Sequence, residues 1–160
     1  EDFFTPDYLY DFFSELYGIP ADRRDVRKAM LFERFGIREF AQVRVRDLST
    51  GMKQKVSLVI SLVQDPEIII FDEPTNGLDI LTAKVVTDFL LDLKEQGKTI
   101  IVSTHIFSLV EKICDRVGII INGRMAACED LWTLCGDKSL EDRFFEIYEA
   151  VNGEEENHDK

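Results

Sequence analysis

The stretch IIIFDEPTNGLD, at positions 68–79, decides the fold class of this chain. It opens with an unbroken apolar run, rich in β-branched residues, which predicts a parallel strand that is buried on both faces. Asp72 and Glu73 follow at the end of that strand, and Pro74 stops the strand from continuing. Because α/β proteins bind ligands at the carboxyl ends of their strands, these carboxylates suggest a place for hydrated Mg²⁺ and an oriented water.

The segments after this strand alternate between helix and strand. A long helix is expected over about 80–95, closed by Gly97, and a second buried strand over 99–102. The remaining expected elements are a helix near 106–114, a strand at 117–121, a hairpin turn at Asn122-Gly123, a short strand at 124–128, and two short helices near 129–134 and 139–150. This alternation predicts an α/β fold that contains part of a parallel sheet.

Helices dominate the region before the first strand. Thr5-Pro6 predicts the start of one helix, and a second helix is expected over about 22–35 and ends at Gly36. Residues 37–47 are expected to form a loop. Seven aromatic residues crowd the first 17 positions: Phe3, Phe4, Tyr8, Tyr10, Phe12, Phe13 and Tyr17. Packing inside the fold is their expected role, and contact with a partner protein is the alternative.

A third helix is expected over about 50–64, within and beyond the stretch LSTGMKQKV at 48–56. Ser49 is placed to cap this helix, and Gly51 lies in its first turn, so backbone N–H groups and a hydroxyl are exposed there. Two lysines near this end oppose the helix dipole unless an anion binds. The stretch therefore predicts an anion site, with an ordinary serine-capped helix as the alternative.

The only histidine outside the C-terminal tail is His105, in the stretch STH at 103–105. A single histidine is more often a structural residue than a catalytic one. His105 follows the second expected strand through Ser103 and Thr104.

Taken together and in this order, LSTGMKQKV, FDEPTNGLD and STH resemble the second half of an ATP-binding-cassette (ABC) transporter ATPase, most of all the ATP-binding proteins of ABC-2-type exporters. The resemblance implies an α/β fold with a partial P-loop NTPase core and a helical signature subdomain. It implies that Asp72 holds Mg²⁺ through water, and that Glu73 is the general base for ATP hydrolysis. His105 would contact the γ-phosphate and help to hold the attacking water.

The same resemblance places ATP between two subunits. Ser49, Gly51 and Met52 would bind the nucleotide that the opposite subunit holds, and Asp79 would reach across the dimer interface. Two positions of the signature depart from the usual family sequence LSGGQ, since Thr50 replaces a glycine and Met52 replaces the glutamine. Ile80 stands where the family often has proline, a change expected to cost little at the start of a helix.

The resemblance also divides the chain into regions and implies partners. The regions are a helical subdomain with the signature motif at 1–64, the second half of the core at 65–128, C-terminal helices at 129–151, and a disordered acidic tail at 152–160. The expected partners are a second ATPase subunit and a transmembrane permease that exports its substrate. They would hold the protein in the cytoplasm, at the inner face of the cell membrane.

No phosphate loop of the form G-x-x-x-x-G-K-[ST] occurs in the 160 residues. Gly97-Lys98-Thr99 resembles the end of one, but position 92, where the first glycine belongs, is an aspartate. The Q-loop glutamine and the adenine-stacking aromatic of the family are also missing. We therefore expect the chain alone to be inactive and to bind ATP and Mg²⁺ only weakly.

Composition separates the remaining alternatives. The net charge of −12 disfavours a surface for duplex nucleic acid, and no apolar run is long enough to cross a bilayer. Three cysteines without a C-x-x-C motif give no pattern for a zinc site. A soluble ABC ATPase of DNA repair or of the ribosome remains an alternative, as does a non-catalytic interaction fragment.

Overall fold

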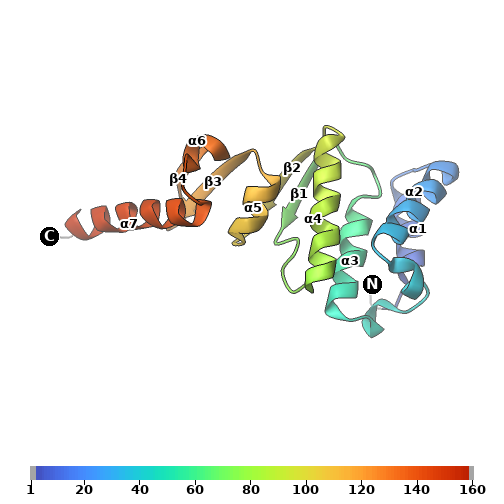
Figure 1. The fold of residues 1–160 in the computed structure, drawn as a ribbon. Helices are drawn as coiled ribbons and strands as arrows, with labels where there is room; N and C mark the ends of the chain where they lie inside the picture. Colours follow the sequence, from blue (N-terminus) through green and yellow to red (C-terminus); the bar gives the residue numbers. More distant parts are fainter. Residues whose placement is uncertain (1–2, 159–160) are drawn as a thin grey trace. The chain divides into compact units, whose positions relative to one another are not determined.

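The structure, a computed structural model, describes residues 3–158, with side chains described through Gly153. The chain forms two compact units, Glu1–Ser103 and Thr104–Lys160 (Figure 1). The boundary between these units lies inside the predicted core region 65–128. Each unit is described separately below.

The first unit begins with a layer of helices. Its elements in chain order are α1 (Pro6–Leu16), α2 (Ala21–Arg34), the 3-10 helices η1 (Ile37–Phe40) and η2 (Val45–Asp47), and α3 (Thr50–Ser61). Thr5 caps α1 by accepting from the N–H of Tyr8, and Gly36 ends α2 with a φ of 65°. These starts and stops confirm the sequence signals at both helices.

Two boundaries in this layer differ from the prediction. Residues 37–47 contain two short 3-10 helices instead of an open loop, because Ile37 and Phe40 lie three positions apart and both turn into the core. Helix α3 ends at Ser61, three residues before its predicted end. The chain then turns, and Asp65 adopts a φ of 53° before the first strand begins.

A pair of parallel strands follows, β1 (Ile68–Asp72) and β2 (Thr99–Ser103). Helix α4 (Ile80–Glu95) joins them and covers one face of the pair (Figure 1). Its bounds match the prediction, and Gly97 closes it with a φ of 82°. Each residue of β1 pairs with one of β2, so the two strands end level with each other.

The prediction that both strands are buried on two faces is wrong. Along β1, Ile69 and Phe71 are buried, whereas Ile68 and Ile70 are exposed, by 63% and 73%. Residues of β2 alternate between exposed and half-buried in the same way. Side chains of a strand point alternately to opposite faces, and here helices cover only one of those faces.

The packing expected for the N-terminal aromatic residues is also wrong for most of them. Tyr10 is fully buried against Phe32, with an edge-to-face angle of 83° between the rings. The exposed members are Phe3, Phe4, Tyr8, Phe12 and Tyr17. Phe4, Tyr8 and Phe12 recur every fourth residue, so their stacked rings form one stripe along α1.

The second unit is a hairpin with three helices. Its elements are α5 (Phe107–Ile113), β3 (Arg116–Ile121), β4 (Arg124–Asp130), α6 (Leu131–Cys135) and α7 (Leu140–His158). Asn122 and Gly123, with φ values of 50° and 75°, form the predicted turn between antiparallel β3 and β4. Its buried core contains Ile119, Ile121, Leu134 and Leu140.

Helix α7 is longer than predicted. The expected disordered tail at 152–160 is helical through His158, because Glu is a strong helix former and the single Gly153 does not end the helix. Residues 159–160 lie outside the described residues. No helix among residues 3–158 combines the length and the apolar character that a membrane span requires.

Candidate active site

The first wall of the candidate site is the start of α3. Ser49 has an extended backbone and an exposed side chain, and its Oγ accepts from the N–H of Met52 over 3.3 Å. Both features confirm that a serine caps this helix. The N–H groups of Thr50 and Gly51, in the first turn, lack the i−4 carbonyls that serve residues deeper in a helix. They and the positive end of the helix dipole therefore favour an anion.

The second wall is the turn that follows β1. Glu73 has a left-handed backbone, with a φ of 46°, and its N–H donates to the carbonyl of Ser103 over 2.8 Å. Gly77 also has a positive φ, of 71°, and its lack of a Cβ removes the strain at that point. Asp72 is exposed and its Oδ1 accepts from the hydroxyl of Ser103, its partner in the strand register.

These two walls are in contact. The side-chain amide of Gln54, on α3, donates to the carbonyl oxygens of Glu73 and Pro74 over 3.5 and 3.4 Å. At Gly51, an added Cβ would lie 3.7 Å from Leu78 Cδ2, so the backbone of α3 lies against the turn. The first turns of α3 therefore pack against the turn that follows β1.

Asp79 ends the turn and caps α4. Its Oδ1 accepts from the N–H of Thr82 over 3.0 Å, and its Oδ2 accepts from the Thr82 hydroxyl over 2.7 Å. The hydrogen bond from the Thr82 hydroxyl, followed by the bond from its N–H, lowers the pKa of Asp79 below its ordinary value. Asp79 thus stays ionised and positions the helix that starts beside the site.

His105 lies in the second unit, at an exposed bend between β2 and α5. The N–H of Ile106 donates to the hydroxyl of Thr104 over 3.2 Å, and this bond shapes the entry into α5. The structure therefore brings together Ser49, Gly51, Met52, Asp72, Glu73 and Asp79 within the first unit, and places His105 in the other.

The carboxylate of Asp72 suits a hard divalent cation that keeps some of its waters. It is exposed, makes no ion pair with any described residue, and offers oxygen, the ligand atom that Mg²⁺ prefers. Residues 3–158 contain no cluster of three or more His, Cys, Asp or Glu side chains that could enclose a metal. The exposed carboxylate of Asp72 fits water-mediated contact with Mg²⁺.

Sequence reasoning missed three residues that build the site. Ser103 could have been found, since two parallel strands that end level bring their last residues together. The pattern D-x-x-T at Asp79 and Thr82 is a recognisable helix cap. The bridge from Gln54 to the turn carries no local sequence signal, because it depends on how α3 packs against a segment about 20 residues away.

Comparisons with known proteins identify the fold and the family. Residues 4–76 match a family model described as ABC transporter. A solved structure of an ATP-binding subunit of an ABC transporter superposes with a TM-score of 0.86 and 28% identity, over 92% of this chain and 63% of that one.

Sequence relatives point the same way. The ABC transporter ATP-binding protein NatA of Bacillus subtilis is 41% identical over 71% of this chain and 46% of its own length. A fluoroquinolones export ATP-binding protein of Mycobacterium tuberculosis is 36% identical over 74% of this chain and 38% of its own length. The chain thus spans 46% and 38% of the lengths of these two relatives.

Proposed function

The chain belongs to the family of ABC transporter ATP-binding proteins, and from this premise we propose that it forms the C-terminal part of an ATP-hydrolysing subunit. Two such subunits would enclose ATP and drive a membrane permease, which we infer to be an exporter because several relatives are named as export proteins. The subunit would act in the cytoplasm, on the inner face of the cell membrane.

The observation that supports this proposal is the contact between α3 and the turn after β1. Gln54 bridges to the backbone of Glu73, and Gly51 lies against Leu78, so the start of α3 packs on the turn that carries Glu73. In the proposed dimer, the helix start would hold the phosphates of one nucleotide while Asp72 and Glu73 act on the other, and this contact fixes the two groups relative to each other.

Each residue has a proposed task in this chemistry. Glu73 accepts a proton from the water that attacks the γ-phosphate, and His105 helps to hold that water. Asp72 holds Mg²⁺ through a water molecule, and the ion when bound neutralises charge on the phosphates. Ser49 and Gly51 donate hydrogen bonds to the phosphates of a nucleotide held by the opposite subunit, with Met52 beside them.

The surface around Asp79 supports contact with a second subunit. Ile80 and Leu81, the first two residues of α4, are 87% and 77% exposed. Exposed apolar side chains beside a functional surface are typical of interfaces. We infer that Asp79 and these residues face the opposite subunit, while the capping bonds of Asp79 fix the start of α4.

The exposed aromatic stripe on α1 supports contact with the permease. Phe4, Tyr8 and Phe12 stack with centroid distances of 4.6 and 6.2 Å and remain 44–48% exposed. Cytoplasmic loops of membrane proteins carry an excess of Lys and Arg, which suits a chain with a net charge of −12.

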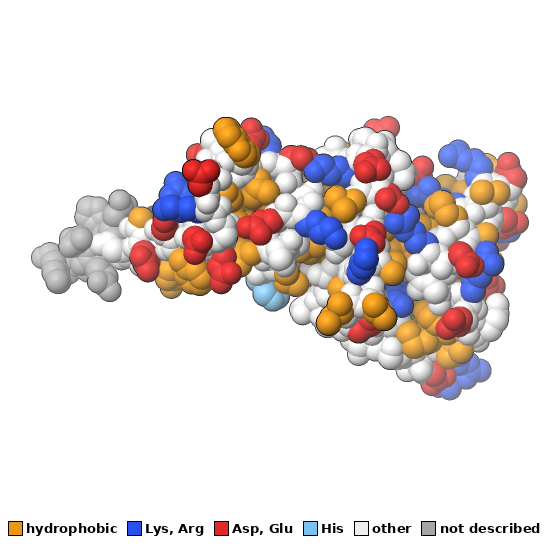
Figure 2. Space-filling view, viewed as in Figure 1, with side chains coloured by type: hydrophobic (Ala, Val, Ile, Leu, Met, Phe, Trp, Pro, Cys, Tyr) orange, Lys and Arg blue, Asp and Glu red, His pale blue; other side chains and the backbone are white. Residues whose placement is uncertain are grey.

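The nucleic-acid alternative would need a surface on which Lys and Arg gather. Acidic and basic side chains are instead interspersed over the face in Figure 2, which does not favour that alternative.

The decisive experiment replaces the proposed base, Glu73, in a subunit that contains both these residues and a phosphate loop. Glu73→Gln should reduce ATP turnover roughly 10²–10⁴-fold, the contribution of a general base, while ATP binding is retained. Phosphate release measures the first quantity and equilibrium binding of labelled ATP the second. Glu67→Gln, an exposed acid before β1, is the matched control and should change neither. Turnover of Glu73→Gln within twofold of the parent would refute the assignment.

A further inference from the structure

One residue of β2 contacts both acidic residues that follow each other at the end of β1. Ser103, the last residue of β2, pairs with Asp72 in the strand register. Its hydroxyl donates to Oδ1 of Asp72, and its carbonyl accepts from the N–H of Glu73 over 2.8 Å. Ser103 therefore holds the side chain of Asp72 and the backbone of Glu73 through two different groups.

The hydroxyl of Ser103 holds one oxygen of Asp72 and leaves the other open. Asp72 is exposed, and its Oδ2 makes no hydrogen bond with any residue that the structure describes. An exposed carboxylate without a donor samples several rotamers, and ordering it when a ligand binds costs conformational entropy. A donor on Oδ1 removes that cost before binding and leaves Oδ2 to accept from water.

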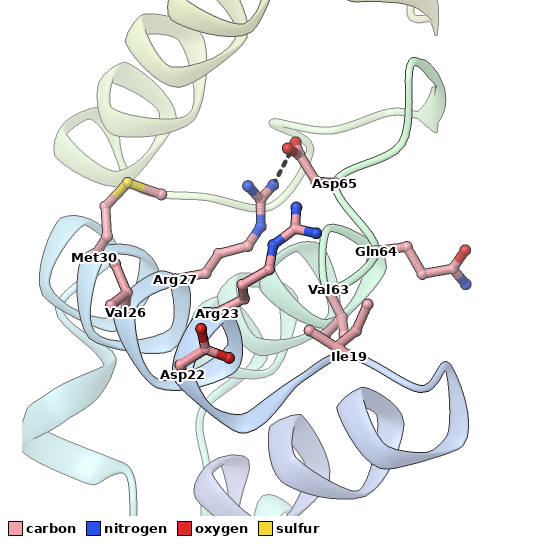
Figure 3. Close-up of a pocket in the computed structure, with 9 residues that line it drawn as sticks. All are labelled: Ile19, Asp22, Arg23, Val26, Arg27, Met30, Val63, Gln64 and Asp65. Atoms are coloured by element: carbon pink, nitrogen blue, oxygen red, sulfur yellow. Dashed lines mark ion pairs between the residues drawn. The ribbon is translucent and has the colours of Figure 1, made fainter.

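The aspartate before β1 shows why a neutral donor matters. Asp65 helps to line a hollow of about 450 Å³ beside α2 (Figure 3). There it accepts from Arg27 over 2.9 Å and from Lys98 over 2.6 Å, so the chain itself compensates its charge. The hydroxyl of Ser103 carries no charge, so it orients the carboxylate of Asp72 and leaves the negative charge available for a cation.

We propose that Ser103 is a positioning residue for Asp72 and sets its carboxylate for water-mediated contact with Mg²⁺. This inference rests on the proposed ATPase function and adds a residue to it. The side chain of Ser103 acts through Asp72 alone. Groups that orient a metal-binding side chain usually change metal affinity roughly 10–100-fold. Because the contact of Asp72 is exposed and passes through water, we expect a smaller effect, of about fivefold.

Substitution of Ser103 separates the task of its hydroxyl from that of its backbone. Ser103→Ala removes the donor to Asp72 and keeps the carbonyl that serves Glu73. In a subunit that contains both these residues and a phosphate loop, the Mg²⁺ concentration for half-maximal ATP turnover should rise about fivefold, while turnover at saturating Mg²⁺ stays within about twofold of the parent. Ser103→Thr retains a hydroxyl and suits a strand, so it should restore the Mg²⁺ dependence.

A second measurement tests the positioning directly and needs neither ATP nor Mg²⁺. In the 160-residue chain, NMR couplings between the backbone and Cγ of Asp72 report the rotamer of its side chain. The parent chain and Ser103→Thr should show one dominant rotamer, and Ser103→Ala should show averaging over several. Ser57→Ala is the matched control, at an exposed serine of α3 that makes no side-chain hydrogen bond with a described residue, and it should change neither measurement.

The outcomes separate this inference from the function on which it rests. If Asp72→Asn shifts the Mg²⁺ titration and Ser103→Ala does not, Ser103 has no positioning role and the ATPase assignment stands. Averaged couplings in the parent chain, or a single rotamer of Asp72 in Ser103→Ala, would also overturn the inference. If neither variant shifts the Mg²⁺ titration, both the inference and the proposed role of Asp72 are wrong.

Discussion

The two ends of β1 use aspartate in opposite ways. Before the strand, Asp65 accepts from Arg27 and Lys98, whose side chains are only 21% and 12% exposed, and so ties α2 and the start of β2 together. After the strand, Asp72 is exposed, and the neutral hydroxyl of Ser103 is the only hydrogen-bond partner of its carboxylate among the described residues. A carboxylate whose charge is already matched by the chain stabilises the fold, whereas an unmatched carboxylate can take a cation from outside.

Among the tests of this comparison, the largest effect is expected for Asp72, the aspartate whose charge the chain leaves unmatched. In a subunit that includes a phosphate loop, Asp72→Asn should lower Mg²⁺-dependent ATP turnover roughly 10–100-fold, the usual cost of losing a group that holds a metal through water. Raised Mg²⁺ should restore part of the loss, because the ion then binds more weakly but still binds. Titration of turnover against Mg²⁺ measures this effect.

The matched control is Asp65→Asn, made in the same protein. Because Asp65 already serves two cations and lies at the other end of the strand, this variant should keep the Mg²⁺ dependence of the parent. If both variants shifted the Mg²⁺ titration equally, the contrast between the two ends of β1 would be lost.

The second prediction concerns stability and reverses the order of the two variants. Asp65→Asn leaves Arg27 and Lys98 without their carboxylate and should lower the free energy of unfolding by about 1–2 kcal/mol, after allowance for solvent screening of a half-exposed side chain. Asp72→Asn should change it by less than about 0.5 kcal/mol, because no ion pair is lost. Urea unfolding followed by circular dichroism measures both. Equal stability of the two variants would contradict the structural role of Asp65.

Local signals predicted much of this fold. The bounds of α4, the Ser49 cap and the turn at Asn122-Gly123 could all be predicted from the sequence, since each depends on a few adjacent residues. Which faces of the strands are buried could not be predicted. The apolar run of β1 indicates a strand, but whether Ile68 and Ile70 are covered depends on elements that lie elsewhere in the chain or outside it.

The candidate site was also predictable only in part from the sequence. Asp72 and Glu73 could be predicted as a pair, because the strand and Pro74 fix their position at its end. The contact of Gln54 with the backbone of Glu73 could not, since it depends on the packing of α3 against a distant turn. The ion pairs of Asp65 could not be predicted for the same reason, because its partners Arg27 and Lys98 lie 38 and 33 residues away in the sequence.

The third prediction uses the pH dependence of stability to test the role of Asp65, the aspartate before β1. The pKa of Asp65 is lowered in the folded chain, so the unfolded chain takes up the proton first as the pH falls. The stability that this group contributes is present above the pKa of an unfolded aspartate, about 4, and is lost as the pH falls through the folded pKa. The melting temperature should therefore fall less between about pH 5 and pH 3 in Asp65→Asn than in the parent chain. Parallel curves would show that Asp65 is not linked to folding.

The smallest expected effect is a gain in stability near the paired end. Tyr10→Phe removes a buried hydroxyl that has no hydrogen-bond partner among the described residues and keeps the ring that packs edge-to-face on Phe32. Since an unsatisfied buried polar group costs free energy, the variant should be more stable by about 1 kcal/mol. Tyr17→Phe, at a ring that is 49% exposed, is the control and should change stability by less than about 0.5 kcal/mol. A loss of stability in Tyr10→Phe would mean that the hydroxyl has a partner, such as a water held beside Arg27 and Asp65.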